Sequence, residues 1–386
     1  MTKFRMSALS ALVAVGVMGM AGAASAAVVG GGATLPEDLY NGNPQGTGIL
    51  TSSVPGFEAY TGVGSGAGKR AFFNNNPAEI NQPAGTTVDY AGSDSLVSTA
   101  ELGTYNNPNN ANGRSSYGAL VQVPSVLTSV TVPYNVAGFN GSLNLTSEQL
   151  AMVFADPTVV NWSDTRLAIP GAPDADIKVV YRTDGSGTTE IFLRHLNAVN
   201  SSLVSSVSNS FSGTIDVSSS KYVGANGSNG VMDALADPDN ANAITYMSPD
   251  KVDFGNPAVV ASINGLLPTA VNVEAAVEEV PVPTGSQINN PLAWGISNPN
   301  PSQGYPIVAS TNLIFSQCYA DSGDKDKILS FFDKHYVYNG ANKAAIDAGG
   351  FIQLPTAWQN AVKDTFGTGG SLQIGATNLC NGVAGR

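Results

Sequence analysis

The 386-residue sequence has very few of the residues that most often carry metal or acid–base chemistry: two histidines and two cysteines. His195 and His335 stand far from each other, and neither has the spacing to the cysteines that zinc sites require. Each falls in a predicted helix among apolar residues, so we interpret both as packing or surface residues. The sequence therefore predicts no catalytic histidine, no metal site and no cofactor.

Positive charge is also scarce, with 17 Lys and Arg against 29 Asp and Glu and a net charge of −12. An acidic surface disfavours nucleic acids and anionic membranes as partners, and we expect neither. An anionic ligand would have to be captured by local groups, against the field of the whole protein.

Long apolar runs are absent apart from residues 8–20, and that run is too short to span a membrane. It follows Lys3 and Arg5 and precedes Ala24-Ser25-Ala26, the order found in a secretory signal peptide. We predict that residues 1–26 are removed and that the mature chain is periplasmic or secreted. No cysteine lies near the cleavage site, so we expect no lipid anchor and no membrane insertion.

The two cysteines, Cys318 and Cys380, belong to this exported part of the chain. Disulfides persist in oxidising compartments, which makes a Cys318–Cys380 bond the expected state and two free thiols the alternative.

Short β-rich runs alternate with helical patterns, which predicts an α/β fold, and the roughly 360 mature residues favour two domains. We expect a first chain crossing between them near residues 128–136 and a returning strand at residues 243–247. Residues 201–230 are predicted to be loop-rich and residues 275–305 to form a surface excursion. The expected helices include those opened by the capping boxes Ser98–Glu101 and Thr146–Gln149, and two C-terminal ones at residues 324–336 and 356–366.

The most informative stretch is residues 177–194, where a β-branched run leads through Gly185-Ser186-Gly187-Thr188 into an amphipathic helix. The N–H groups that open a helix have no intrahelical partner and lie at the positive end of its dipole. With Ser and Thr hydroxyls beside them, they form an anion site. Arg182 adds a cation whose planar fork suits oxyanions. An ordinary capped helix is the alternative.

Two further glycine-rich turns of the same chemistry favour the anion site: residues 30–37, with Pro36 at a helix start, and residues 62–69. The second is not a nucleotide-binding P-loop, because Val63 and Arg70 occupy positions that need Gly and Ser or Thr. Neither Ser65 nor Ser186 fits an esterase elbow, which needs a glycine two residues before and two residues after the serine.

These turns, with Ala91-Gly92-Ser93-Asp94-Ser95, resemble in order the phosphate-binding proteins of phosphate-uptake ABC transporters. The similarity is greatest to the DING-like branch of that family, and the segments that carry it are residues 123–126, 305–307, 311–319 and 378–382. The chain departs from that branch at its start, where Ala27-Val28-Val29-Gly30 replaces Asp-Ile-Asn-Gly. The places of a second disulfide of the branch are here Ala151 and Val199.

The resemblance implies a two-lobed periplasmic binding protein fold (type II) with the ligand cleft between the lobes. We expect residues 27–135 and 250–386 to form lobe I and residues 136–249 to form lobe II. Residue by residue, the resemblance also implies a phosphate-binding set made of Thr34, Leu35, Ser65, Asp94, Arg182, Ser186, Gly187 and Thr188. Asp184 is the expected partner that orients Arg182 from behind, in a position where the DING-like branch often has Glu.

Asp94 sets a condition on the ligand, because a carboxylate repels a bound anion unless the anion has a proton to donate. Phosphate carries such a proton at neutral pH and sulfate does not, so an ionised, acceptor-only Asp94 would reject sulfate. A turn-capping Asp is the simpler alternative.

The sequence thus predicts an exported, non-catalytic phosphate receptor, expected to be a monomer, that serves an ABC transporter permease in the inner membrane. The alternatives are a secreted phosphatase of low turnover, which would need an activated nucleophile or metals, and a surface or matrix protein on the same fold.

Overall fold

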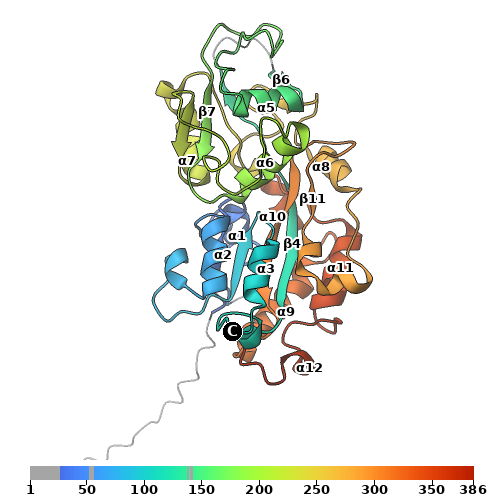
Figure 1. Ribbon diagram of the computed structural model, residues 1–386. Helices are drawn as coiled ribbons and strands as arrows, with labels where there is room; N and C mark the ends of the chain where they lie inside the picture. The colour runs from blue at the N-terminus through green and yellow to red at the C-terminus, as the bar shows by residue number, and fades with distance from the viewer. Residues whose placement is uncertain (1–26, 52–55, 137–138, 140–141) are drawn as a thin grey trace, which may run out of the picture.

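The computed structural model describes residues 27–51, 56–136, 139 and 142–386; the predicted signal peptide lies outside this part. The described chain forms two lobes, each built around its own sheet with helices packed against it (Figure 1). The predicted α/β class and two-lobed architecture are thereby confirmed. Among the described residues, no helix combines the length and apolar character needed to cross a membrane.

The larger sheet lies in the lower lobe of Figure 1 and has the strand order β11-β12-β3-β1-β2, with β4 also paired to β12. The strands β1, β2 and β3 are parallel, whereas β12 is antiparallel to β3, β4 and β11. Their bounds are β1 Gly30–Gly32, β2 Thr61–Gly62, β3 Tyr90–Ser93, β4 Leu120–Ser129, β11 Ser297–Asn298 and β12 Val308–Ser316.

The sheet of the upper lobe has the order β5-β9-β7-β8, in which β7 is parallel to both of its neighbours. Its strands are β5 Tyr134–Asn135, β7 Lys178–Arg182, β8 Tyr222–Ala225 and β9 Ala243–Ile244. The chain therefore passes from one sheet to the other between β4 and β5, within the predicted crossing at residues 128–136. The lobe boundaries at residues 135 and 249 stay a prediction.

Helices cover both sheets (Figure 1). In the lower lobe these are α1 Glu37–Asn41, α2 Ser65–Asn74, α3 Thr99–Tyr105, α4 Arg114–Tyr117, α9 Ser322–His335, α10 Lys343–Ala348, α11 Thr356–Phe366 and α12 Thr377–Cys380. The upper lobe contains α5 Ser147–Ala155, α6 Gly187–Val199 and α7 Gly227–Ala236. The remaining elements are α8 Ala270–Val277 and the short parallel pair β6 Asn144–Leu145 and β10 Ser262–Ile263.

Both predicted capping boxes are present. Ser98 accepts from the backbone N–H of Glu101, whose carboxylate accepts from the N–H of Ser98, and Thr146 and Gln149 make the same exchange. The helix α11 has the predicted bounds, and α9 begins two residues earlier than predicted, where Asp321 caps it.

The prediction of a surface excursion at residues 275–305 is wrong for its second half. There β11 joins the large sheet, and Trp294 is fully buried against the rings of Trp358 and Phe366 at centroid distances of 6.3 and 4.9 Å. The Pro and Asn residues of this segment mark turns, but burial of the tryptophan depends on partners more than 60 residues further along the chain, which local composition does not report.

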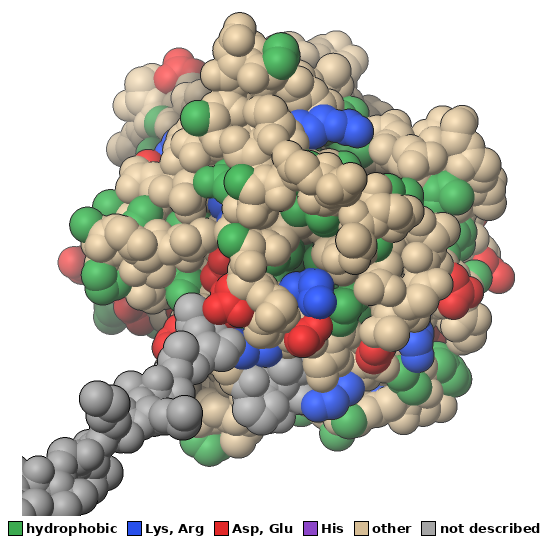
Figure 2. All heavy atoms as spheres, turned by 90° about the horizontal axis from the view of Figure 1, so that it is seen from below, with side chains coloured by type: hydrophobic (Ala, Val, Ile, Leu, Met, Phe, Trp, Pro, Cys, Tyr) green, Lys and Arg blue, Asp and Glu red, His purple; other side chains and the backbone are tan. Residues whose placement is uncertain are grey.

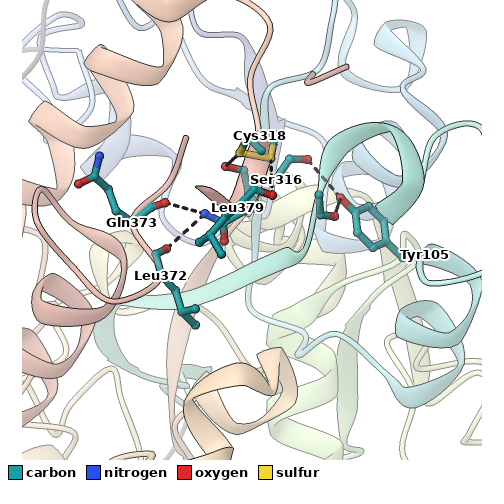
Figure 3. The surroundings of a disulfide bond; sticks show 9 residues. Tyr105, Ser316, Cys318, Leu372, Gln373 and Leu379 are labelled. Atoms are coloured by element: carbon teal, nitrogen blue, oxygen red, sulfur yellow. Dashed lines mark hydrogen bonds between the residues drawn. A yellow bond between two sulfur atoms is a disulfide. The ribbon is translucent and has the colours of Figure 1, made fainter. Parts of the chain in front are cut away.

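The predicted disulfide is confirmed: Cys318, just after β12, is bonded to Cys380 at the end of α12. The neighbouring Gln317 also binds the C-terminal segment: its amide Nε2 donates to the carbonyls of Leu372 and Gln373 at 3.3 and 2.6 Å (Figure 3). The C-terminal segment is thus attached to the central strand of the large sheet both covalently and by hydrogen bonds.

The lower face of the molecule carries acidic and basic side chains close to one another, on a surface made mostly of backbone and of side chains that are neither charged nor hydrophobic (Figure 2). Exposed ion pairs such as Arg70–Glu79, at 2.8 Å, each contribute little to stability because water screens them. The fold depends instead on the apolar clusters on either side of its sheets.

We predict that replacing both cysteines, Cys318→Ala with Cys380→Ala, lowers the free energy of unfolding. The bond joins residues 62 apart, and a loop of that length gives a stabilisation of about 4 kcal/mol on the chain-entropy account. Thermal unfolding with and without reductant is the measurement: reductant should bring the wild type toward the double variant and leave the variant unchanged. Equal stability of the oxidised wild type and the variant would contradict this role.

Candidate functional site

Four of the predicted site segments meet where the two lobes touch. Thr34 and Leu35 follow β1, Ser65 follows β2 at the start of α2, Asp94 follows β3, and residues 186–188 open α6 after β7. All four segments lie beyond the carboxyl ends of parallel strands, which is where ligands bind in α/β sheets. The two lobes thus present equivalent edges to each other.

The lobes are in direct contact at this place. The backbone N–H of Gly66 donates to the carbonyl of Gly185 at 3.0 Å. The hydroxyls of Thr34 and Ser228, one from each lobe, lie 2.9 Å apart. At Gly187 an added Cβ would stand 2.5 Å from both the Asp94 Cβ and the Ser65 Oγ, so only a glycine permits this approach.

Arg182 is the cation of the site, and its side chain is only 3% exposed. Its guanidinium is held in a two-point contact by Asp184, with Nε donating to Oδ1 at 2.7 Å and Nη2 donating to Oδ2. Its Nη1 donates to the Ser228 hydroxyl at 3.3 Å. Burial raises the pKa of Asp184, but the hydrogen bonds and charge of Arg182 outweigh burial and leave that pKa below its usual value. Asp184 is therefore ionised and fixes the plane of the guanidinium, as expected for a partner that orients Arg182.

Asp94 is the second charged group, and it is 4% exposed. Its backbone N–H donates to the Ser65 hydroxyl at 3.1 Å, while its Oδ1 is buried and has no hydrogen-bond partner. Burial raises the pKa of Asp94 to about 7, although the Thr311 hydroxyl, the charge of Arg182 and the Ser65 hydroxyl each lower it. An acceptor oxygen left without a donor at this depth is the kind of atom that a ligand satisfies.

The start of α6 provides the neutral donors. Ser186 is the N-cap, and its hydroxyl accepts from the N–H of Thr189 at 3.1 Å. The N–H groups of the first turn, at Gly187 and Thr188, lie at the positive end of this 13-residue helix. The Thr188 hydroxyl, like Asp94 Oδ1, is buried without a partner. This turn can donate to an anion without adding a full charge.

The side chain of Leu35, by contrast, is fully buried in the apolar core of the lower lobe, so only its backbone could reach a ligand. The structure thus gathers the predicted residues around one place between the lobes, and their roles as ligands stay a prediction.

Sequence reasoning missed Ser228, which contacts both Thr34 and Arg182. It lies at the start of α7, inside a stretch predicted as loop-rich to residue 230, and that prediction is wrong from β8 onward. The N–H of Gly227, next to it, donates to Asp184 Oδ1 at 2.9 Å. A sequence signal was present: Gly227-Ser228 follows a β run directly, as Gly64-Ser65 does.

Both histidines are buried and engaged elsewhere. The ring nitrogens of His195 contact the Pro299 carbonyl at 2.8 Å and the Ser147 hydroxyl at 3.0 Å. Those of His335 contact the Ser125 carbonyl at 2.9 Å and the Asn342 amide at 3.0 Å. The two rings serve packing and hydrogen bonding in the core, as predicted.

Comparison with known proteins identifies relatives over nearly the whole chain. Residues 22–331 match the family described as PBP superfamily domain. Alkaline phosphatase L of Pseudomonas aeruginosa is 40% identical over 92% of this chain and 93% of its own. A phosphate-binding protein of an unknown prokaryotic organism is 39% identical over 92% and 98% of the two chains. The structure of a high-affinity periplasmic phosphate-binding protein (PfluDING) bound with phosphate has 40% identity and a TM-score of 0.83, over 93% of this chain and 99% of that one.

We predict that Gly187→Ala prevents the lobes from meeting, because the new methyl group would lie 2.5 Å from atoms of Asp94 and Ser65 and 2.7 Å from the Ser95 N. The matched control is Gly185→Ala, whose Cβ would have no neighbour closer than 3.4 Å. Small-angle scattering of both variants should show a larger radius of gyration for Gly187→Ala alone. The same radius for both would contradict the assignment of Gly187 to the contact between lobes.

Proposed function

Because this chain belongs to the PBP superfamily, we propose that it is an exported solute-binding protein that captures inorganic phosphate between its lobes. The single observation that carries this proposal is that the Arg182 guanidinium and the Asp94 carboxylate, whose Oδ1 has no hydrogen-bond partner, are both buried at one place. A cation alone would suit any anion. A carboxylate beside it accepts only an anion that brings a proton.

Charge counting favours phosphate over sulfate. Arg182 and Asp184 form a contact pair whose charges cancel, so an ionised Asp94 leaves the site with a negative balance. A phosphate with one proton donates to Asp94 Oδ1 and thereby replaces repulsion by a hydrogen bond. Sulfate has no proton near neutral pH and would leave Oδ1 unsatisfied next to a second negative group.

Neutral donors complete the proposed ligand set. They are the hydroxyls and N–H groups at Thr34, Leu35, Ser65, Ser186, Gly187 and Thr188. Such preorganised dipoles stabilise an anion in a site shielded from water without a large positive charge, which agrees with an acidic protein. They come from both lobes, so binding favours the closed arrangement by the difference in affinity for the two states.

We propose further that the mature chain is periplasmic or secreted and delivers phosphate to an ABC transporter permease. This step rests on the predicted signal peptide and on the family resemblance.

A second candidate function is phosphate-ester hydrolysis, favoured by the name of one 40% identical relative, alkaline phosphatase L. The geometry supports binding better. The hydroxyl of Ser65 accepts from Asp94 N, that of Ser186 caps α6, and the ring nitrogens of both histidines are engaged elsewhere. None of these serines has a histidine placed to act as its general base.

We predict no turnover of a chromogenic phosphate ester by the purified mature protein, while inorganic phosphate binds. The assay is run with and without chelator, and a Ser65→Ala variant is the control for contaminating phosphatase. Turnover that co-purifies with the wild type and is lost in Ser65→Ala would contradict a purely binding role.

We also predict that Asp94→Asn narrows the selectivity of the site. The substitution replaces a negatively charged acceptor with a neutral amide that can itself donate a hydrogen bond. Sulfate should therefore bind more tightly, while the affinity for phosphate should fall modestly. We expect the ratio of the two affinities to fall by at least about tenfold, or roughly 1.4 kcal/mol. Calorimetric titration of wild type and variant with both anions near pH 8 is the measurement.

The comparison variant is Arg182→Ala, which should weaken the binding of both anions, because its charge attracts either one. An Asp94→Asn variant that excludes sulfate as strongly as the wild type would refute the account of selectivity.

A further inference from the structure

The pairing of β12 with β3 places the Thr311 hydroxyl beside Asp94, and an irregularity on the other side of β12 adds Ser125 nearby. Along the β12–β4 pairing Thr311 faces Val126 but Asn312 faces Pro124, so Ser125 is an extra residue in β4. On the other side of β12, Asn312 faces Ser93. The antiparallel register therefore brings Thr311 next to Asp94. Bulges of this kind redirect side chains and are frequent beside functional sites.

Alternation along β12 determines which way the Thr311 side chain points. It shares a face with Leu313 and Phe315, which pack in the same core as Tyr40 of α1. The hydroxyls of Ser125 and Thr311 both lie beside the Tyr40 hydroxyl, close enough to oppose the rise of its pKa on burial. Asp94 and these three hydroxyls therefore form one polar group inside an apolar core.

The hydrogen-bonding state of these atoms indicates how they are joined. Asp94 Oδ1, Thr311 Oγ1 and the Tyr40 hydroxyl are each buried, and none has a hydrogen-bond partner of normal geometry among the described residues. Buried polar atoms rarely stay unpaired, and these are one another's neighbours. An ionised carboxylate only accepts hydrogen bonds, so Thr311 must be the donor to Asp94, and the lone pairs of Thr311 accept from Tyr40. Each carboxylate oxygen can accept more than once, so the bond from Thr311 leaves an acceptor site for a ligand.

The far end of this group is neutral. Ser125 lies 3.5 Å from His335 Nε2, and burial lowers the pKa of His335 to about 4, so the ring is uncharged near neutral pH. The chain of hydroxyls therefore brings dipoles to Asp94 and no charge.

We propose that Thr311 is a positioning residue that donates its hydroxyl to Asp94, with Tyr40 and Ser125 behind it, and so keeps Asp94 an ionised acceptor that rejects unprotonated oxyanions. The inference rests on the proposed function, because it assigns to residues outside the ligand set the control of selectivity at the same site.

The protonation state of Asp94 near neutral pH is sensitive to the loss of a single hydroxyl. Burial raises the pKa of Asp94 to about 7, close to physiological pH. The charged and titratable groups near it are Arg182, which lowers this pKa, Asp250, which raises it, and the buried phenols of Tyr40 and Tyr60. Among the groups that lower it, the Thr311 hydroxyl contributes most. Removing that hydroxyl therefore moves the protonation of Asp94 to higher pH.

Sulfate is the probe, because it stays fully ionised between pH 6 and 9 and its binding reports how much Asp94 is protonated. We expect sulfate to bind the wild type more tightly as pH falls. Thr311→Val keeps the shape and loses the donor, so its sulfate affinity at pH 8 should exceed that of the wild type by about five- to tenfold, as expected for a shift of nearly one pKa unit. At pH 6, where Asp94 is largely protonated in both, the two affinities should converge.

Three further variants separate this role from a structural one. Thr311→Ser retains the hydroxyl and should restore the wild-type pH profile. Thr128→Val removes a buried hydroxyl of β4 that donates to the Ser129 carbonyl at 3.2 Å, and should leave the profile unchanged. Tyr40→Phe should raise the sulfate affinity at pH 8 in the same direction, by about two- to threefold. It remains a test of the inference if Thr311→Val fails to fold.

A sulfate profile of Thr311→Val equal to that of the wild type would overturn the inference, as would an equal change at every pH. Failure of the proposed function is a distinct result, since it would appear in the wild type as an absence of phosphate binding. A wild type that binds phosphate and excludes sulfate, together with an unshifted Thr311→Val, would refute the role of Thr311 alone.

Discussion

The rest of this structure depends on one carboxylate, Asp94, buried at the contact between two lobes beside a guanidinium whose charge is already balanced. Arg182 is held by Asp184 through both of its carboxylate oxygens, so its charge is largely balanced before any ligand is present. An isolated buried charge is costly, and the protein meets that cost in part by a pKa near neutrality. On the proposed function, such a site accepts an anion only together with a proton.

Closure of the lobes follows from the same arrangement. Glycines at the facing turns let backbones approach where any side chain would collide, as at Gly187, and the contacts Gly66–Gly185 and Thr34–Ser228 bridge the lobes. The hydrogen-bond donors at this place are helix N–H groups and hydroxyls from both lobes. A ligand that satisfies them gains contacts that neither lobe provides alone, which is the differential affinity that a closing receptor requires.

The local parts of this picture could be predicted from the sequence. The strand–turn–helix at residues 177–194, both capping boxes, α11 and the pairing of Cys318 with Cys380 each depend on neighbouring residues or on a choice of two cysteines. The contacts made over long distances could not be predicted. Burial of Trp294, the approach of Ser228 to Thr34 and the place of Thr311 beside Asp94 depend on packing and on the pairing of β12 with β3, which local patterns do not encode.

The central claim, that the contact between the lobes holds a tetrahedral oxyanion because it brings a proton to Asp94, is tested most directly by titrating the purified, phosphate-free mature protein. Calorimetry at pH 8 with phosphate and with sulfate gives both affinities and the stoichiometry. The account predicts one phosphate per chain and sulfate binding at least about 100-fold weaker, a difference of roughly 2.7 kcal/mol. Equal affinity for the two anions, or no phosphate binding, would contradict it.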